Sequence, residues 1–132
     1  MLILPETLRT NLLAAARAGF PHEVCGLLEG TRGEGGVTVT AIHPAANVSP
    51  TPHEAFEIDP AAQFALQRAL RGTGREVVGC YHSHPNGRAE PSPRDRACSY
   101  PAGFVWIIIA TGVIEAVAAF EAPSFLPLTI RV

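Results

Sequence analysis

The side chains of this chain best suited to chemistry are two histidines in His82-Ser83-His84 and a carboxylate further on, Asp95. Two imidazoles and one carboxylate that leave a fourth position for water form the ligand set of a catalytic zinc ion, whereas structural zinc sites are closed by four protein ligands. We therefore expect His82, His84 and Asp95 to bind Zn²⁺. A His-x-His pair alone also occurs on ordinary surface strands, so the prediction rests on the combination with Asp95.

The residues before the histidines predict how the two imidazoles are positioned. Residues 76–81 read Glu-Val-Val-Gly-Cys-Tyr, which is apolar and β-branched enough for a buried strand. Residues i and i+2 of a strand point to the same face, so His82 and His84 can converge on one point. Pro85 has no N–H for the ladder and is expected to end the strand.

A helix start is predicted at Ser92-Pro93-Arg94-Asp95. Serine is a preferred N-cap residue, proline suits the first helical position, and an acidic residue three positions after the cap completes a capping box. This local role does not exclude metal binding, because a helix that begins here holds Asp95 in its first turn, near the end of the histidine strand.

Glu23 lies where an N-terminal helix is expected to give way to an apolar strand. On sequence alone its commoner fate is a solvated charge at the start of a strand. A zinc hydrolase, however, needs a base that takes a proton from water and returns it to the leaving group. Glu23 is therefore a candidate for that base.

Together, Glu23, His82-Ser83-His84, Ser92 and Asp95 resemble the motif of the JAMM (MPN+, JAB1/MPN/Mov34) metalloprotease family, in its small prokaryotic branch. Residues 23–30 and 47–60 are also similar to that family. The resemblance covers nearly the whole chain and implies its fold, an α/β class with a single compact domain whose mixed central β-sheet is flanked by helices. That is the JAB1/MPN, cytidine deaminase-like arrangement.

The same resemblance implies the chemistry. The chain would be a zinc metallopeptidase, a deubiquitinase-like isopeptidase, with Zn²⁺ held by His82, His84 and Asp95. Glu23 would be the general base, and the Ser92 hydroxyl would stabilise the oxyanion. The scissile amide or isopeptide bond would follow the C-terminal glycine of a ubiquitin-like or sulfur-carrier protein, whose extended tail would lie along an exposed strand edge near the site.

Two other functions stay open. Some MPN-type proteins are catalytically idle interaction modules, and this chain could be one that binds metal without turnover. The bacterial RadC proteins carry a similar His-x-His-Pro and Ser-x-x-Asp pattern with less settled chemistry, but they have an additional N-terminal helical region.

Length and charge narrow the class further. With 132 residues and 14.0 kDa, the chain fits one domain, residues 1–132, large enough for a core without disulfides. A formal net charge of −2 and a pI near 6.2 give no electrostatic reason to expect a nucleic-acid partner. Three cysteines, Cys25, Cys80 and Cys98, make a disulfide framework improbable on number alone, and Cys98 is expected on the same helix as Asp95.

The longest apolar stretch, residues 104–120, is interrupted by Thr111-Gly112 and Glu115, so we interpret it as two core strands joined by a tight turn rather than a membrane span. Residues 1–20 lack the basic start of a signal peptide. We therefore expect a soluble cytoplasmic protein with no membrane partner.

The remaining pattern predicts an α/β sheet with helices packed on it. The expected helices cover residues 5–18 and 60–71, and the expected strands cover 2–4, 24–28, 36–43, 56–58, 104–110, 113–121 and 125–131.

Overall fold

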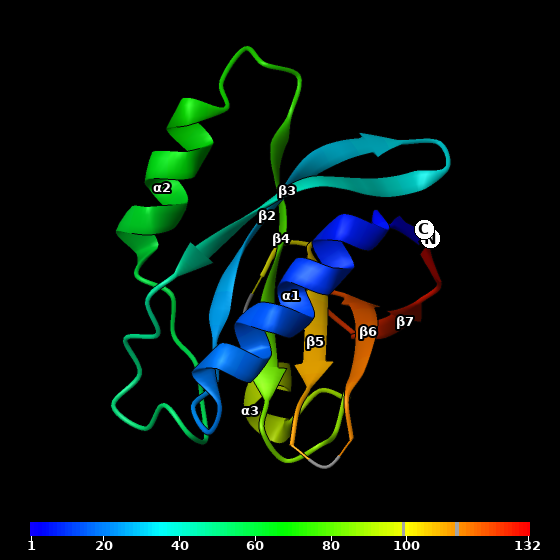
Figure 1. The fold of residues 1–132 in the computed structure, drawn as a ribbon. Helices are drawn as coiled ribbons and strands as arrows, with labels where there is room; N and C mark the ends of the chain where they lie inside the picture. Colours follow the sequence, from blue (N-terminus) through cyan, green and yellow to red (C-terminus); the bar gives the residue numbers. More distant parts are fainter. Residues whose placement is uncertain (99, 113) are drawn as a thin grey trace.

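The computed structural model describes residues 1–98, 100–112 and 114–132. Its framework is an eight-stranded mixed sheet with the strand order β7-β6-β5-β4-β2-β3-β1-β8 (Figure 1). The two outermost strands follow each other in the chain with only Thr129 between them, so the sheet curls until its edges nearly meet. The strands are β1 Leu2–Ile3, β2 Cys25–Gly33, β3 Gly36–Ala45, β4 Glu76–His84, β5 Val105–Ala110, β6 Ala116–Glu121, β7 Leu126–Leu128 and β8 Ile130–Arg131.

Three helices accompany the sheet: α1 Glu6–Gly19, α2 Pro60–Ala69 and α3 Pro93–Arg96. Helix α1 crosses one face, as Figure 1 shows, and buries Leu12 and Ala16 against it. The short helix α3 lies at the end of the sheet where β4 and β5 finish. The structure is thus the single compact α/β domain that the sequence predicts, with few helices around a mixed sheet.

Apolar side chains form two clusters, and alternation along the strands explains the division. One cluster contains Leu12 of α1, Tyr81 of β4 and Ile107 of β5; the other contains Cys80 and Trp106. All six residues of β5 are buried, which accounts for its uninterrupted apolar sequence. His82 and His84 follow Cys80 at even positions of β4 and therefore point to the side of Trp106.

Strand β4 is paired on both sides, antiparallel to β2 and parallel to β5. Cys25 lies opposite His82, and His84 lies opposite Ala110. The histidine strand therefore offers no edge of its own to an incoming peptide. Unpaired edges among the described residues lie two strands away on either side, on the outer side of β3, where β1 pairs only with Val37 and Thr38, and on the outer side of β6 before Ala119.

Several sequence expectations need correction. Residues 56–58 do not form a strand, and only a single bridge joins Asn47 to Ile58, because the Asn47 side chain takes the Glu57 N–H. The expected strand 125–131 is split at Thr129 into β7 and β8, which lie at opposite edges of the sheet.

The ends of the helices and of several strands also differ from the sequence prediction. The N-terminal helix runs one residue later at both ends than expected, and α2 stops at Ala69 rather than at residue 71. Helix α3 has only four residues and ends at Arg96, so Cys98 lies beyond it rather than on it. β2 begins one residue later than predicted and extends to Gly33, at the turn before Gly36, and β3 extends two residues further than predicted, to Ala45. Of the expected strand 113–121, residue 113 lies outside the described residues and β6 begins at Ala116.

All three cysteines are free; Cys25 and Cys80 are buried and Cys98 is exposed. The helices of the described ranges are too short or too polar to cross a lipid bilayer.

Candidate metal centre

Three donor atoms meet at the end of β4. The Nε2 atoms of His82 and His84 are 2.9 Å apart, and Oδ2 of Asp95 lies 3.1 Å from each of them. A tetrahedral zinc ion with bonds of about 2.0 Å separates its ligand atoms by roughly 3.3 Å. The three donors thus form a triangle a few tenths of an ångström smaller than one zinc ion requires, and they fit such an ion after a small expansion.

The two imidazoles are oriented in different ways. Nδ1 of His84 donates to the backbone carbonyl of Arg88 at 3.0 Å, a bond that leaves the Nε2 lone pair free for a metal. His82 is fully buried, and its Nδ1 has no hydrogen-bond partner among the described residues. Its ring is held by packing instead, stacked on Phe56 at 4.2 Å between ring centroids and edge-on to Trp106 at 5.5 Å.

Asp95 is fixed by the predicted capping box. Its backbone N–H donates to Oγ of Ser92 at 3.0 Å, and its Oδ2 accepts from the Ser92 N–H at 2.9 Å. Pro93 occupies the first helical position, as the sequence predicts. The cap therefore holds the carboxylate of Asp95 toward the histidines. Its Oδ2 atom contacts both the Ser92 N–H and the two imidazole Nε2 atoms.

Glu23 is 6 % exposed and completes the cluster. One of its carboxylate oxygens lies within 4.8 Å of imidazole nitrogens of both His82 and His84. Either carboxylate could serve as the third ligand, but Oδ2 of Asp95 already touches both imidazoles. The longer separation of Glu23 leaves room for a water molecule between it and the triangle.

The chain around Glu23 is tightly held. Its N–H donates to the Pro52 carbonyl at 2.7 Å, and its carbonyl accepts from Nδ2 of Asn47 at 2.9 Å. The next residue, Val24, donates its N–H to Oγ of Ser83 at 2.8 Å. Ser83 therefore points away from its flanking histidines, as expected, and ties β4 to the backbone that carries Glu23.

Electrostatics in the cluster follow from burial and contact. Burial raises the pKa of Glu23 to about 7; His84 and Arg94 oppose the rise, and Asp95 adds to it. Burial also acts to raise the pKa of Asp95, but hydrogen bonds from His82 and His84 hold that pKa well below its usual range. Glu23 is thus a carboxylate that can take or give a proton near neutral pH, whereas Asp95 stays charged.

The pKa values of the two imidazoles shift in opposite directions. Burial lowers the pKa of His82, with Asp95 only partly opposing. Burial also acts to lower the pKa of His84, but its hydrogen bond to Asp95 outweighs this and raises it. Metal binding requires both imidazoles to be neutral. The two histidines therefore bind a metal ion best at a pH above the pKa of His84.

Residues of the loop 46–59 line two clefts, and cluster residues line the first of them. The first has a volume of about 280 Å³ and is lined by Glu23, His53, Glu54, His84, Pro85, Asn86 and Ser92. The second, of about 440 Å³, is lined by Phe56, which stacks on His82, and by loop residues, Arg94, Cys98 and Tyr100. The first cleft thus contains cluster residues directly, and the second is connected to the cluster through the contact of Phe56 with His82.

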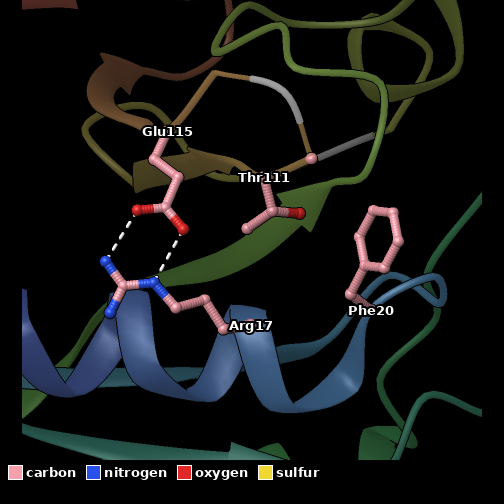
Figure 2. Close-up of a pocket in the computed structure, with 5 residues that line it drawn as sticks. Arg17, Phe20, Thr111 and Glu115 are labelled. Atoms are coloured by element: carbon pink, nitrogen blue, oxygen red, sulfur yellow. Dashed lines mark hydrogen bonds and ion pairs between the residues drawn. The ribbon is translucent and has the colours of Figure 1, made fainter.

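A further hollow of about 420 Å³ lies between α1 and the end of β5 (Figure 2). Arg17 and Glu115 face each other there through two hydrogen bonds of 2.7 and 2.6 Å. Phe20 and Thr111 line the other side of the hollow. The guanidinium and the carboxylate satisfy each other, and none of the predicted site residues lines the hollow. It is therefore not the candidate active site.

All five site residues predicted from the sequence come together: Glu23, His82, His84, Ser92 and Asp95. Their roles as ligands, base and oxyanion donor remain predictions. Sequence reasoning missed Phe56 against His82, the Arg88 carbonyl on His84, and the cleft residues His53 and Glu54. None of these carries a local signal, because their positions depend on the path of irregular loops.

Comparison with known proteins gives a consistent class. The family described as prokaryotic homologues of the JAB domain matches residues 5–122, which is most of the chain. The chain therefore belongs to the prokaryotic JAB family, the small JAMM/MPN branch that the sequence motif indicates, and is a JAMM-type hydrolase.

Three similar proteins illustrate the comparison. A desampylase from Haloferax volcanii is 39 % identical over 111 residues, 81 % of this chain and 78 % of that protein. A probable TtuB-protein conjugate cleaving protease from Thermus thermophilus is 41 % identical over 93 residues, 70 % of this chain and 56 % of that protein. The solution structure of a protein from Desulfitobacterium hafniense superposes with a TM-score of 0.85 at 28 % identity, covering 99 % of this chain and 92 % of the other.

Proposed function

We propose that this hydrolase uses zinc to cleave the amide or isopeptide bond that follows the C-terminal glycine of a ubiquitin-like or sulfur-carrier protein. The observation that carries the proposal is the triangle of His82, His84 and Asp95 with the buried Glu23 beside it. The similar proteins named as a desampylase and a conjugate-cleaving protease support the choice of substrate. A cytoplasmic location stays a prediction.

In this proposal each residue has one task. His82, His84 and Asp95 hold the ion, which supplies Lewis-acid activation of a water molecule when bound. Glu23 accepts the proton of that water at its carboxylate and returns it to the departing amine. Burial raises the pKa of Glu23, so its carboxyl group holds the transferred proton more readily than an exposed carboxyl group does.

Ser92 is proposed to stabilise the oxyanion that forms at the glycine carbonyl. Its Oγ accepts from the Asp95 N–H, and the hydroxyl hydrogen has no acceptor among the described residues. The lone pair caps the helix while the hydrogen stays available for the substrate. Helix capping and oxyanion binding therefore do not compete.

The carrier tail is assigned to the cleft lined by Phe56 and Arg94, on the side of the cluster away from Glu23. An exposed strand edge next to β4 cannot receive it, because β2 and β5 occupy both sides. The wall of this cleft at Phe56, which stacks on His82, is the alternative along which a glycine-terminated tail can lie.

The substitution Glu23→Gln tests the proposal. It removes the proton acceptor and keeps the size of the side chain, so we expect a 10²- to 10⁴-fold loss of kcat with metal binding retained. The measurement is cleavage of a glycine-terminated ubiquitin-like carrier joined to a lysine side chain, with metal content determined in parallel. Glu34→Gln, an exposed carboxylate in the β2–β3 turn, is the matched control. Unchanged turnover in Glu23→Gln would remove the general-base role from Glu23, and no turnover in the zinc-loaded native protein would favour an idle MPN-type module instead.

A further inference from the structure

The cleft on the Glu23 side receives the leaving group. Glu23 lines this cleft and not the other one. Under the proposed function, the C–N bond of the amide breaks, the water oxygen joins the glycine carbonyl carbon, and Glu23 passes the water's proton to the nitrogen. Because that transfer requires contact, the departing amine and the groups attached to it must lie in the cleft that Glu23 lines.

Charge is unevenly distributed around this cleft. A second carboxylate, Glu54, lines it together with Glu23, and the remaining lining side chains are His53, His84 and uncharged residues. Glu54 is exposed and makes no ion pair with any of the described residues. Its negative charge therefore faces whatever occupies the cleft.

The nearest guanidinium groups are directed elsewhere. Arg94 lines the other cleft, and its Nη1 donates to Oγ1 of Thr51 at 3.4 Å. Arg88 is paired with Glu90 at 3.8 Å and is not among the residues that line this cleft. No arginine of the described residues lines the leaving-group cleft, and the chain contains no lysine.

From this placement we infer that Glu54 sets the leaving-group specificity of the enzyme by excluding a carboxylate from the cleft. The inference rests on the proposed function. A free α-amino acid joined to the carrier brings its own carboxylate next to the reacting nitrogen, where it meets Glu54 in a cleft that no arginine of the described residues lines. A lysine side chain of a protein brings only methylene groups and leaves as an amine, which becomes an ammonium ion by taking the proton that the new glycine carboxyl group releases, and Glu54 attracts that ion. The substrate class is therefore a carrier–lysine isopeptide rather than a carrier–amino acid adduct.

The test compares substrates that differ in one charge. A single carrier protein is extended after its C-terminal glycine with alanine or with alaninamide, and a third conjugate joins the same glycine to a lysine side chain. The zinc-loaded native protein is expected to prefer alaninamide over alanine in kcat/KM by about tenfold, because like charges a few ångströms apart at a protein surface repel with this effect. Glu54→Gln is expected to reduce the preference for the alaninamide conjugate, and Glu54→Arg is expected to reverse it. Glu34→Arg, with the same change of net charge far from the cleft, leaves the preference as in the native protein.

A second measurement does not depend on turnover. In the Glu23→Gln background, calorimetry is expected to show weaker binding of the alanine conjugate than of the alaninamide conjugate, with the difference removed by Glu54→Arg. Equal cleavage and equal binding of the two conjugates by the native protein overturn the inference while the proposed function stands. Failure of the zinc-loaded protein to cleave all three conjugates overturns the proposed function, and the inference with it.

Discussion

Ser92 shows how one side chain can serve both the fold and the reaction. Its oxygen accepts the Asp95 N–H at 3.0 Å, which caps α3 and fixes the carboxylate that points to the histidines. The hydroxyl hydrogen is a separate hydrogen-bond donor that the cap does not use. Two substitutions can therefore separate the structural role from the proposed oxyanion role.

Glycine at an N-cap costs only a few tenths of a kcal/mol relative to serine, whereas alanine costs about 1 kcal/mol. We expect Ser92→Gly to unfold at nearly the native denaturant concentration yet lose about 10²-fold in kcat, the usual cost of one oxyanion donor. Ser92→Ala should lose stability as well. Urea unfolding and steady-state kinetics on both variants check this. A Ser92→Gly protein with native turnover would leave Ser92 with the capping role alone.

At the residue scale, the sequence predicts that the side chains of His82, His84 and Asp95 converge, because local rules place them. Alternation on a strand brings His82 and His84 together, and a capping box fixes Asp95. Contacts made by irregular loops are different. The stacking of Phe56 on His82 and the carbonyl of Arg88 on His84 depend on loops whose course no periodicity describes.

At the element scale, the loop 46–59 is organised by a side chain rather than by a strand ladder. Nδ2 of Asn47 donates to the carbonyls of Glu23 and Ala55, and its Oδ1 accepts the N–H groups of Ser49 and Glu57. One amide thus joins the segment that carries Glu23 to the loop that separates the two clefts.

Asn47→Asp should disturb this loop strongly, although the two side chains have nearly the same size. The acceptor contacts of Oδ1 are kept, but the amide donor is replaced by an oxygen that faces two carbonyl oxygens. We expect a loss of about 1–3 kcal/mol in the free energy of unfolding and a fall in kcat/KM, while metal binding is retained because the triangle lies on other elements. Thermal unfolding, metal analysis and kinetics on Asn47→Asp and Asn47→Ala test this. Loss of the metal in Asn47→Asp would contradict the separation of loop and triangle.

Regular elements are largely predictable from the sequence, and their ends are less so. The strand of residues 76–84, the β2–β3 hairpin and α1 follow apolar periodicity, and Pro85 follows directly after the last residue of β4. The split of residues 125–131 between the two sheet edges could not be predicted, because it results from curling of the whole sheet. The short α3 is a second case, since the start signal at Ser92 says nothing of helix length.

At the scale of the whole molecule, Glu29 joins three segments of the sheet. Its carboxylate accepts from His43 of β3 at 2.8 Å and from Arg75, just before β4, at 2.5 Å. Burial acts to raise the pKa of Glu29, but these hydrogen bonds outweigh it and lower the pKa below its ordinary value of 4.5. The folded state therefore holds the charged carboxylate more strongly than the unfolded chain does.

The sign of the pH effect follows from that shift. A carboxyl pKa that is lower in the folded state stabilises the fold above the unfolded value, and the contribution disappears as the pH falls through the folded value. Glu29→Gln is thus expected to reduce the free energy of unfolding by about 1–2 kcal/mol near pH 7, between the values for exposed and buried pairs. The difference from the native protein should shrink below pH 4.5. Urea unfolding at pH 7 and pH 3.5, with Glu34→Gln as control, measures it; a difference that does not change with pH would contradict the assignment.

The most direct test of the central claim is the metal content of the purified protein together with its cleavage of a carrier–lysine conjugate before and after chelation. We predict one equivalent of zinc per chain, loss of cleavage when a chelator removes it, and recovery when zinc is restored. Asp95→Asn, which keeps the shape of the ligand and removes its charge, should bind zinc far more weakly. Full cleavage by protein that contains no divalent metal would contradict the account.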